Sequence, residues 1–160
     1  MKGLQVTVML AVENSGRAHE KALSGRFWKQ IATEAFAQEG IQVRKAVHDL
    51  YRGEHTGLTS VLTLSVSHMD VHTALEFGEV EIALYSCGGE VPTLRAVAVL
   101  LKRLDFHGMW LKDAPQFQER GHNYSNNARK KGICDRIGML RAVRRNCRWR
   151  RICKEICGST

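Results

Sequence analysis

Three strand-like runs follow one another between residues 58 and 86, with no helix-length segment between them. They span Leu58–Leu64, Met69–Thr73 and Val80–Ser86, and each is rich in apolar and β-branched residues. The turn Glu76–Gly78 separates the second run from the third. Consecutive strands of this kind favour an antiparallel sheet, which is the strongest constraint that the sequence places on the fold.

Two helices and three further strands are predicted around this central region. Gly3–Val12 and Ile41–Tyr51 have the composition and alternation of strands, and Met109–Leu111 predicts a short last strand. Apolar residues recur at helical spacing over Ala18–Gln38 and over Val91–Leu104. The predicted order is therefore β-α-β-β-β-β-α-β. We expect an α+β fold, a two-layer sandwich in which an antiparallel-rich sheet carries two helices on one face.

The formal charge of +8 belongs to one end of the chain. Residues 1–120 hold 13 Lys and Arg against 14 Asp and Glu, a net charge of −1, whereas residues 121–160 hold 11 against 2, a net charge of +9. We therefore expect a domain over 1–121 and a basic C-terminal extension over 122–160, with a helix over 137–156. The arginines of the extension suit weak nucleic-acid or anion binding, and a basic solvated tail without a ligand is the simpler interpretation.

The cysteines divide in the same way. Cys87 is alone in the first 120 residues, and an odd total of 5 with no regular spacing argues against a disulfide scaffold. Zinc ligands favour closely paired spacing, which in the extension only Cys153 and Cys157 approach, so we predict no metal site. No run approaches the length of a membrane span and the N-terminus lacks a signal-peptide pattern, so we expect a cytoplasmic protein without membrane contact.

Ser67 is the candidate nucleophile of the chain. A serine hydroxyl that attacks the preceding carbonyl converts a peptide bond into an ester, and this needs a donor for the oxyanion and a base for the serine α-proton. Thr59 supplies a hydroxyl, His72 a candidate general base, and Cys87 a later proton donor. These residue types are also common in half-buried strands, and spacing alone favours that structural interpretation.

A run of short motifs over Gly57–Gly88 resembles the prokaryotic S-adenosylmethionine decarboxylase family. Thr-Gly-Leu-Thr, Ser-x-Ser-His, x-x-His-Thr, Glu-Phe-Gly and Tyr-Ser-Cys-Gly appear here in the family's order and without gaps, within a similarity that spans roughly 3–121. These enzymes cut their own backbone and convert a serine into a pyruvoyl group.

The resemblance implies a role for each matched residue. Ser67 matches the precursor of the pyruvoyl group, His72 the processing base, Thr59 a processing hydroxyl and Cys87 the catalytic proton donor. Glu76 matches a glutamate of the substrate pocket, and we add His68 as a second substrate-binding candidate. The implied activity is self-cleavage before Ser67, followed by decarboxylation of S-adenosylmethionine or a related amino acid in polyamine synthesis, with no metal. We expect a homodimer. The pyruvoyl carbonyl would condense with the substrate amine and act as an electron sink.

The sequence departs from the family pattern at three places. Val66 stands where the family has a glutamate before the serine, Ala74 and Leu75 replace an aromatic-proline pair, and Ala83 replaces an aspartate. These departures leave a second hypothesis open, an unprocessed and non-catalytic homologue that binds a ligand or partner. The joint presence of Ser67 and its predicted helpers favours the enzyme.

Overall fold

The computed structural model describes residues 3–104 and 108–119, and in 113–119 it describes the backbone alone. The elements are β1 (Leu4–Val12), α1 (Gly16–Ala22), α2 (Gly25–Ala37), β2 (Val43–Arg52), β3 (Thr56–Leu64), β4 (Ser67–Ala74), the short 3-10 helix η1 (Leu75–Phe77), β5 (Glu79–Ser86), α3 (Glu90–Arg103) and β6 (Met109–Glu119). The predicted domain end at Gly121 and the predicted helix over 137–156 lie outside the described residues.

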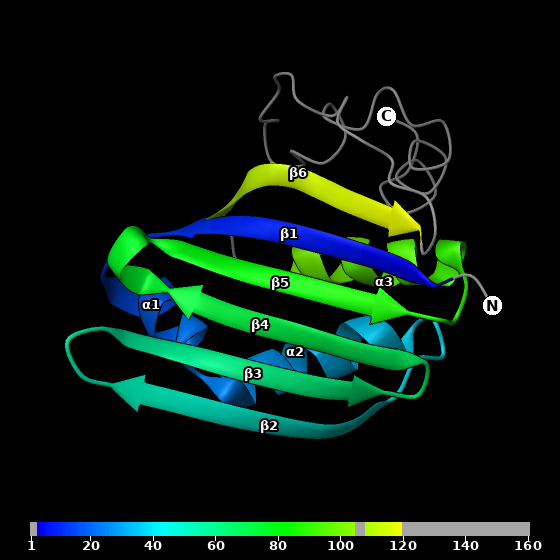
Figure 1. Cartoon of the computed structure of the whole chain (residues 1–160), viewed down its shortest axis with the longest axis horizontal. Helices are drawn as coiled ribbons and strands as arrows, with labels where there is room; N and C mark the ends of the chain where they lie inside the picture. Colours follow the sequence, from blue (N-terminus) through cyan, green and yellow to red (C-terminus); the bar gives the residue numbers. More distant parts are fainter. Residues whose placement is uncertain (1–2, 105–107, 120–160) are drawn as a thin grey trace.

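One six-stranded sheet organises the described chain, in the order β2-β3-β4-β5-β1-β6 (Figure 1). Every neighbouring pair runs antiparallel, and β2 to β5 are neighbours in sequence as well as in space. The first strand of the chain lies between β5 and β6, so β1 joins the central hairpins to the last strand. The predicted antiparallel α+β sheet is confirmed.

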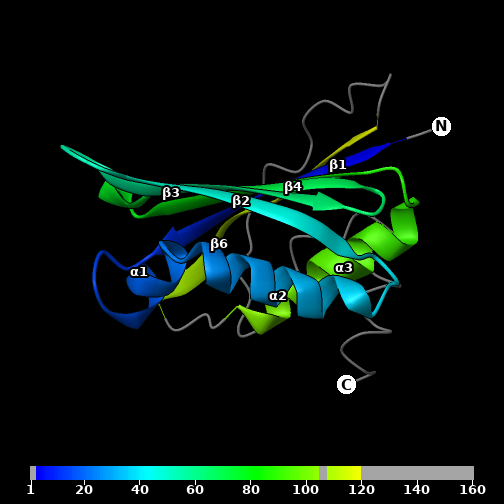
Figure 2. The same ribbon diagram turned by 90° about the horizontal axis from the view of Figure 1, so that it is seen from below.

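All three α-helices lie on one face of the sheet, as the edge-on view in Figure 2 shows. Alternate residues of the strands point toward them, which is clearest in β1, where every second side chain is buried. In α2, Trp28 and Phe36 are fully buried, and the Trp28 indole N–H donates to the carbonyl of Ala22 at 2.9 Å. The core is therefore a single apolar layer between sheet and helices.

Two expected elements differ from the observed ones. The single helix predicted over Ala18–Gln38 is two helices, because α1 ends at Ala22 with Leu23 as its C-cap, and Ser24 caps α2 by accepting a hydrogen bond from the Phe27 backbone N–H at 3.2 Å. The last strand, predicted to be short, continues to Glu119. It contains Pro115, which lacks a backbone N–H donor and is tolerated because β6 is an edge strand with irregular register opposite β1.

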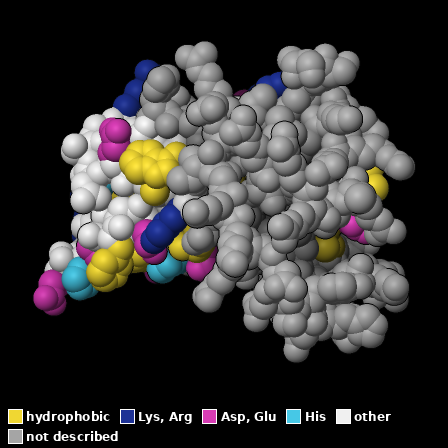
Figure 3. Space-filling view, turned by 90° about the horizontal axis from the view of Figure 1, so that it is seen from above, with side chains coloured by type: hydrophobic (Ala, Val, Ile, Leu, Met, Phe, Trp, Pro, Cys, Tyr) yellow, Lys and Arg dark blue, Asp and Glu magenta, His cyan; other side chains and the backbone are white. Residues whose placement is uncertain are grey.

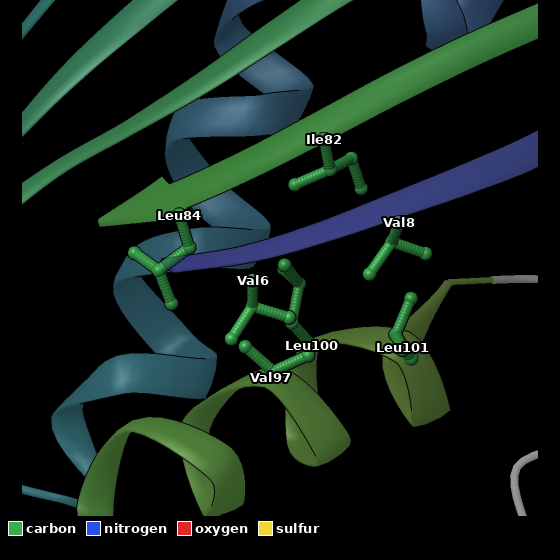
Figure 4. A pocket seen from close by; sticks show the side chains of 7 residues that line it. All are labelled: Val6, Val8, Ile82, Leu84, Val97, Leu100 and Leu101. Atoms are coloured by element: carbon green, nitrogen blue, oxygen red, sulfur yellow. The ribbon is translucent and has the colours of Figure 1, made fainter. Parts of the chain in front are cut away.

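A small cavity lies between β1, β5 and α3 (Figure 4). Its lining is entirely aliphatic and includes Val6, Ile82 and Leu100. The cavity is on the helix side of the sheet and offers no polar group to a ligand, so it is a packing feature of the core rather than a substrate site.

The opposite face of the sheet carries no helix among the described residues (Figure 2). Val47 on β2 and Val61 on β3 are opposite one another in the register and point to this face, where their side chains are 69% and 39% exposed. We call this the open face. Figure 3 shows the molecule from above and not onto this face, and hydrophobic, acidic, basic and histidine side chains lie close together on the described part that it shows.

Neither a membrane-spanning helix nor a metal-binding cluster is found within residues 3–104 and 108–119. No helix there is both long and apolar enough to cross a bilayer. No group of three or more His, Cys, Asp and Glu side chains in that part of the chain could hold a metal ion.

Candidate functional site

Ser67 begins β4 directly after a tight hairpin turn. Leu64 of β3 pairs with Ser67, so the loop consists of Ser65 and Val66 alone. Both ends of this loop are held from outside the hairpin. The Ser65 backbone N–H donates to the carbonyl of Gln42 at 2.8 Å, and the Cys87 backbone N–H donates to the carbonyl of Val66 at 2.9 Å. The peptide bond predicted to be cut, Val66–Ser67, therefore lies in a turn fixed on two sides.

The backbone of this turn is unusual for a two-residue hairpin. The favoured turns need a positive φ at the first loop residue, which Gly or Asn usually provides. Ser65 and Val66 have no positive φ, whereas Ser67 has a φ of +157°, the one positive value at a non-glycine residue in the described chain. This value borders the extended region, and Ser67 is the first paired residue of β4. The external hydrogen bonds help to hold this geometry.

Cys87 follows the last residue of β5 and lies beside the turn. Ser86 pairs with Ser67 across β4 and β5, which brings the next residue next to the predicted cleavage bond. The Cys87 thiol is free and the residue is exposed. Its backbone N–H already holds the carbonyl that Ser67 would attack, so side chain and backbone of Cys87 are available for separate tasks.

His68 also lies at this end of β4. Its Nδ1 is 3.5 Å from the Ser67 hydroxyl oxygen, at the limit of a hydrogen bond, and its Nε2 is 3.8 Å from a carboxylate oxygen of Asp70. The ring stacks on Tyr85, its cross-strand partner on β5, with centroids 5.7 Å apart. The structure thus brings Ser67, His68 and Cys87 together as one group, which we call the serine half-site.

Thr59 and His72 form a second group on the open face. They are cross-strand partners on β3 and β4, and the Thr59 hydroxyl oxygen lies 3.0 Å from Nδ1 of His72. Which of the two atoms donates depends on the histidine tautomer. The pair couples a hydroxyl to an imidazole ring, which is a common general acid or base in proteins. We call it the histidine half-site.

Tyr51 on β2 completes the histidine half-site. Its ring stacks on His72 with centroids 6.5 Å apart, and its hydroxyl donates to the carbonyl of Thr73 at 3.0 Å. It crosses β3 over Gly57, where an added Cβ would lie 2.0 Å from the tyrosine oxygen. Burial raises the pKa of the Tyr51 phenol, and the nearby carboxylates of Glu76 and Asp49 raise it further, so the phenol stays a donor at neutral pH.

A length of β4 separates the two half-sites within one chain. Ser67 and His72 are five positions apart in the same strand, and a strand rises about 3.3 Å per residue, which puts their Cα atoms roughly 16 Å apart. This is far beyond the reach of a hydrogen bond. The sequence suggested one constellation, and the structure places its members in two groups.

Glu76 lies in η1, beyond the histidine end of β4. Its carboxylate is 4.0 Å from Nδ1 of His55, and its side chain is partly exposed. Leu75, which stands at the position of the family's proline, is buried in the core. Nearby, Lys112 of β6 pairs with Glu79 of β5. Glu76 is close enough to Tyr51 to help raise the pKa of that phenol, so it is associated with the histidine half-site.

Sequence reasoning missed two residues of this region, Tyr51 and Gly88. A signal existed for the first, because a glycine opposite an aromatic residue in a strand pair favours an aromatic ring that folds over the glycine. Gly88 has no such signal. Its importance comes from the close approach of Val66, which the fold alone reveals: an added Cβ at Gly88 would lie 3.0 to 3.2 Å from three atoms of that side chain.

Comparison with known proteins places this arrangement in one family. The profile of the family described as S-adenosylmethionine decarboxylase matches residues 9–115. An S-adenosylmethionine decarboxylase proenzyme of Symbiobacterium thermophilum is 39% identical over 71 residues, which are 44% of this chain and 52% of that protein. One from a Sulfurihydrogenibium species is 40% identical over 48 residues, which are 30% of this chain and 36% of that protein. The chain thus matches about half or less of the length of these relatives.

A solved structure extends the likeness to the whole fold. The adenosylmethionine decarboxylase of Aquifex aeolicus superimposes with a TM-score of 0.55 and 23% identity, over 78% of this chain and 97% of that one. At this identity the superposition shows a shared fold. The family profile covers most of the described residues, including both half-sites. The chain therefore belongs to the S-adenosylmethionine decarboxylase family.

Proposed function

We propose that the chain is a self-cleaving decarboxylase that cuts itself between Val66 and Ser67 and then acts on S-adenosylmethionine. The observation that carries this proposal is the fixed turn before Ser67, in which the carbonyl to be attacked already accepts a hydrogen bond of 2.9 Å from Cys87. Family membership and the names of the relatives support the activity.

The self-cleavage follows from the residues around the turn. The Ser67 hydroxyl adds to the Val66 carbonyl carbon, its proton passes to the Ser67 nitrogen, and the C–N bond breaks to leave an ester. A base then removes the Ser67 α-proton, and β-elimination releases the upstream chain as the Val66 carboxylate. Tautomerisation and addition of water expel ammonia and leave a pyruvoyl group at residue 67. His72 is the proposed base, and Thr59 bonds its ring nitrogen.

The pyruvoyl carbonyl would supply an electron sink for loss of the substrate carboxylate. The chain's own residues would handle protons and binding around it. The Cys87 thiol, exposed beside residue 67, is the proposed proton donor after decarboxylation. Glu76 is the proposed carboxylate for the positively charged substrate, and the stacked His68 ring offers a flat surface beside the reacting group.

The direct test is the mass of the purified chain under denaturing conditions. Cleavage yields two fragments, the second blocked at its N-terminus by the pyruvoyl group, and Ser67→Ala leaves one uncut mass. Ser15→Ala is a matched control, because the Ser15 side chain makes no capping hydrogen bond and lies outside both half-sites. A single full-length mass for the unsubstituted chain after long incubation would refute the proposal and favour a non-catalytic homologue.

We further propose that two copies of the chain complete each site. His72 cannot reach Ser67 of its own chain, since roughly 16 Å of β4 lies between them. If two open faces meet around a two-fold axis that crosses β4 midway, the histidine half-site of one copy lies against the serine half-site of the other. The exposed Val47 and Val61 on this face supply apolar surface for such a contact. The proposed homodimer thus follows from the assignment of His72 as the base for Ser67.

A further inference from the structure

We propose that Gly88 and the Cys87 backbone amide form a positioning device for self-cleavage, in which Val66 is the part that is held. This inference rests on the proposed cleavage before Ser67. The Val66 carbonyl then has a fixed hydrogen-bond donor in the chain's own backbone. Val66, which stands where the family has a glutamate, has the function of positioning that carbonyl.

The donor already lies where negative charge develops. When the Ser67 hydroxyl oxygen adds to the Val66 carbonyl carbon, the carbonyl oxygen becomes an oxyanion. The Cys87 N–H points at this oxygen across 2.9 Å before the reaction starts, so no group must move to stabilise the charge. A backbone donor is also independent of the Cys87 side chain, which remains free for a later step.

The Val66 side chain is seated against Gly88. A Cβ at residue 88 would lie 3.0 Å from one Val66 methyl carbon and 3.2 Å from both the other methyl and the Val66 Cβ. Val66 is partly buried against the core, and its β-branched side chain has few rotamers with which to move aside. The close contact between Gly88, which has no side chain, and the stiff Val66 side chain therefore sets the position of the Val66 carbonyl.

Gly88 is itself held in place by buried polar groups. Its backbone N–H donates to the Ser86 hydroxyl at 3.1 Å, and that hydroxyl also accepts from the Thr93 hydroxyl at 2.8 Å. Ser86 and Thr93 are both buried, so the loop between β5 and α3 is anchored at the start of the helix. The backbone at Gly88, which contacts the Val66 side chain, is thus fixed before cleavage.

The test is the rate of self-cleavage of freshly made full-length chains. We expect Gly88→Ala to slow cleavage about tenfold or more, because loss of one oxyanion donor costs about a hundredfold or more and displacement weakens it in part. Gly53→Ala is the matched control: its Cβ would meet nothing closer than 4.0 Å, so its rate stays at the wild-type value. Adding Val66→Ala to Gly88→Ala removes both methyl contacts and should restore much of the rate.

Hydroxylamine identifies the affected step, because it cuts an accumulated ester. The Gly88→Ala chain should yield no extra fragments, since its ester forms slowly, whereas a His72→Ala chain should be cut by the reagent. A Gly88→Ala chain that is cleaved as fast as the wild type would overturn this inference and leave the proposed function intact. An uncleaved wild-type chain would overturn both.

Amide hydrogen exchange gives a readout that is separate from cleavage. In the uncleavable Ser67→Ala chain, the Cys87 amide should exchange slowly, and adding Gly88→Ala should speed its exchange while the amides in the middle of β5 stay protected. An unprotected Cys87 amide in the Ser67→Ala chain would show that the carbonyl is not held, whatever the cleavage rates.

Discussion

The two ends of β4 are built by different means. At the serine end, backbone groups hold the turn: the Ser65 amide donates to the Gln42 carbonyl, and the Cys87 amide donates to the Val66 carbonyl. At the histidine end, side chains hold one another, with Thr59 and Tyr51 both contacting His72. The difference teaches that backbone groups hold the proposed cleavage bond, whereas side chains orient the proposed base.

The same difference explains what the sequence could reveal. Side-chain types are visible in a sequence, so Thr59 and His72 were predicted as helpers, and the register confirms that they are neighbours. A backbone donor leaves no trace in the residue types, so the bond from the Cys87 amide to Val66 could not be foreseen. The separation of Ser67 from His72 was missed because closeness in sequence was taken for closeness in space.

The largest expected effect comes from removing the side chain of Ser67 at one end of β4 or of His72 at the other. Ser67→Ala should abolish cleavage, and His72→Ala should slow it by about a hundredfold or more, the usual contribution of a general base. The two variants should stop at different points, which mass spectrometry after hydroxylamine treatment separates. If the His72→Ala chain accumulates no ester, His72 acts before the ester forms. The two ends of β4 would then not serve separate steps.

Cys87→Ser should separate maturation from turnover. The substitution keeps the backbone amide, so cleavage should stay within about threefold of wild type, while decarboxylation should fall by about a hundredfold, as expected when a proton donor is lost. Fragment masses and release of carbon dioxide measure the two steps. Slow cleavage in this variant would show that the thiol, and not the amide, serves the serine end.

Tyr51→Leu should have a moderate effect, confined to the histidine end. Losing the stacked ring removes about 0.5 to 1.5 kcal/mol of aromatic contact, which corresponds to roughly two- to tenfold slower cleavage. Tyr51→Phe keeps the ring and should behave closer to wild type. Equal and large losses in both variants would point instead to the hydroxyl bond with Thr73 as the essential contact.

The smallest effect is expected away from both half-sites, at His48. Burial lowers the pKa of His48, and Lys29 lowers it further, so the folded chain favours the neutral ring, whose Nδ1 lies 2.9 Å from the Ser60 hydroxyl. The stability that neutral His48 contributes is fully present above the ordinary histidine pKa of about 6.5. It is lost as the pH falls through the lower pKa that His48 has in the folded chain. His48→Asn should therefore lose less melting temperature between pH 7.5 and 5.5. An unchanged pH dependence would remove His48 from the account.

The rest of the fold shows where sequence patterns are sufficient. Alternation located the strands, because a sheet with one buried face imposes a period of two on its side chains. It failed at β6, where Pro115 interrupts the pattern and the position at the sheet edge makes the proline tolerable. It also failed at Ser24, where apolar periodicity continues across a cap that separates two helices.

The most direct test of the divided site is a mixture of two inactive chains. A Ser67→Ala chain has an intact histidine half-site, and a His72→Ala chain has an intact serine half-site. If each site is built from two copies, unfolding and refolding the two together should produce fast cleavage of the His72→Ala chain, in about half of its copies at equal mixing. The Ser67→Ala chain alone stays uncut, and the His72→Ala chain alone is cut about a hundredfold more slowly than the wild type or less. If a mixture shown to contain mixed dimers is cleaved no faster than the His72→Ala chain alone, the account is contradicted, and His72 of one copy does not act on Ser67 of the other.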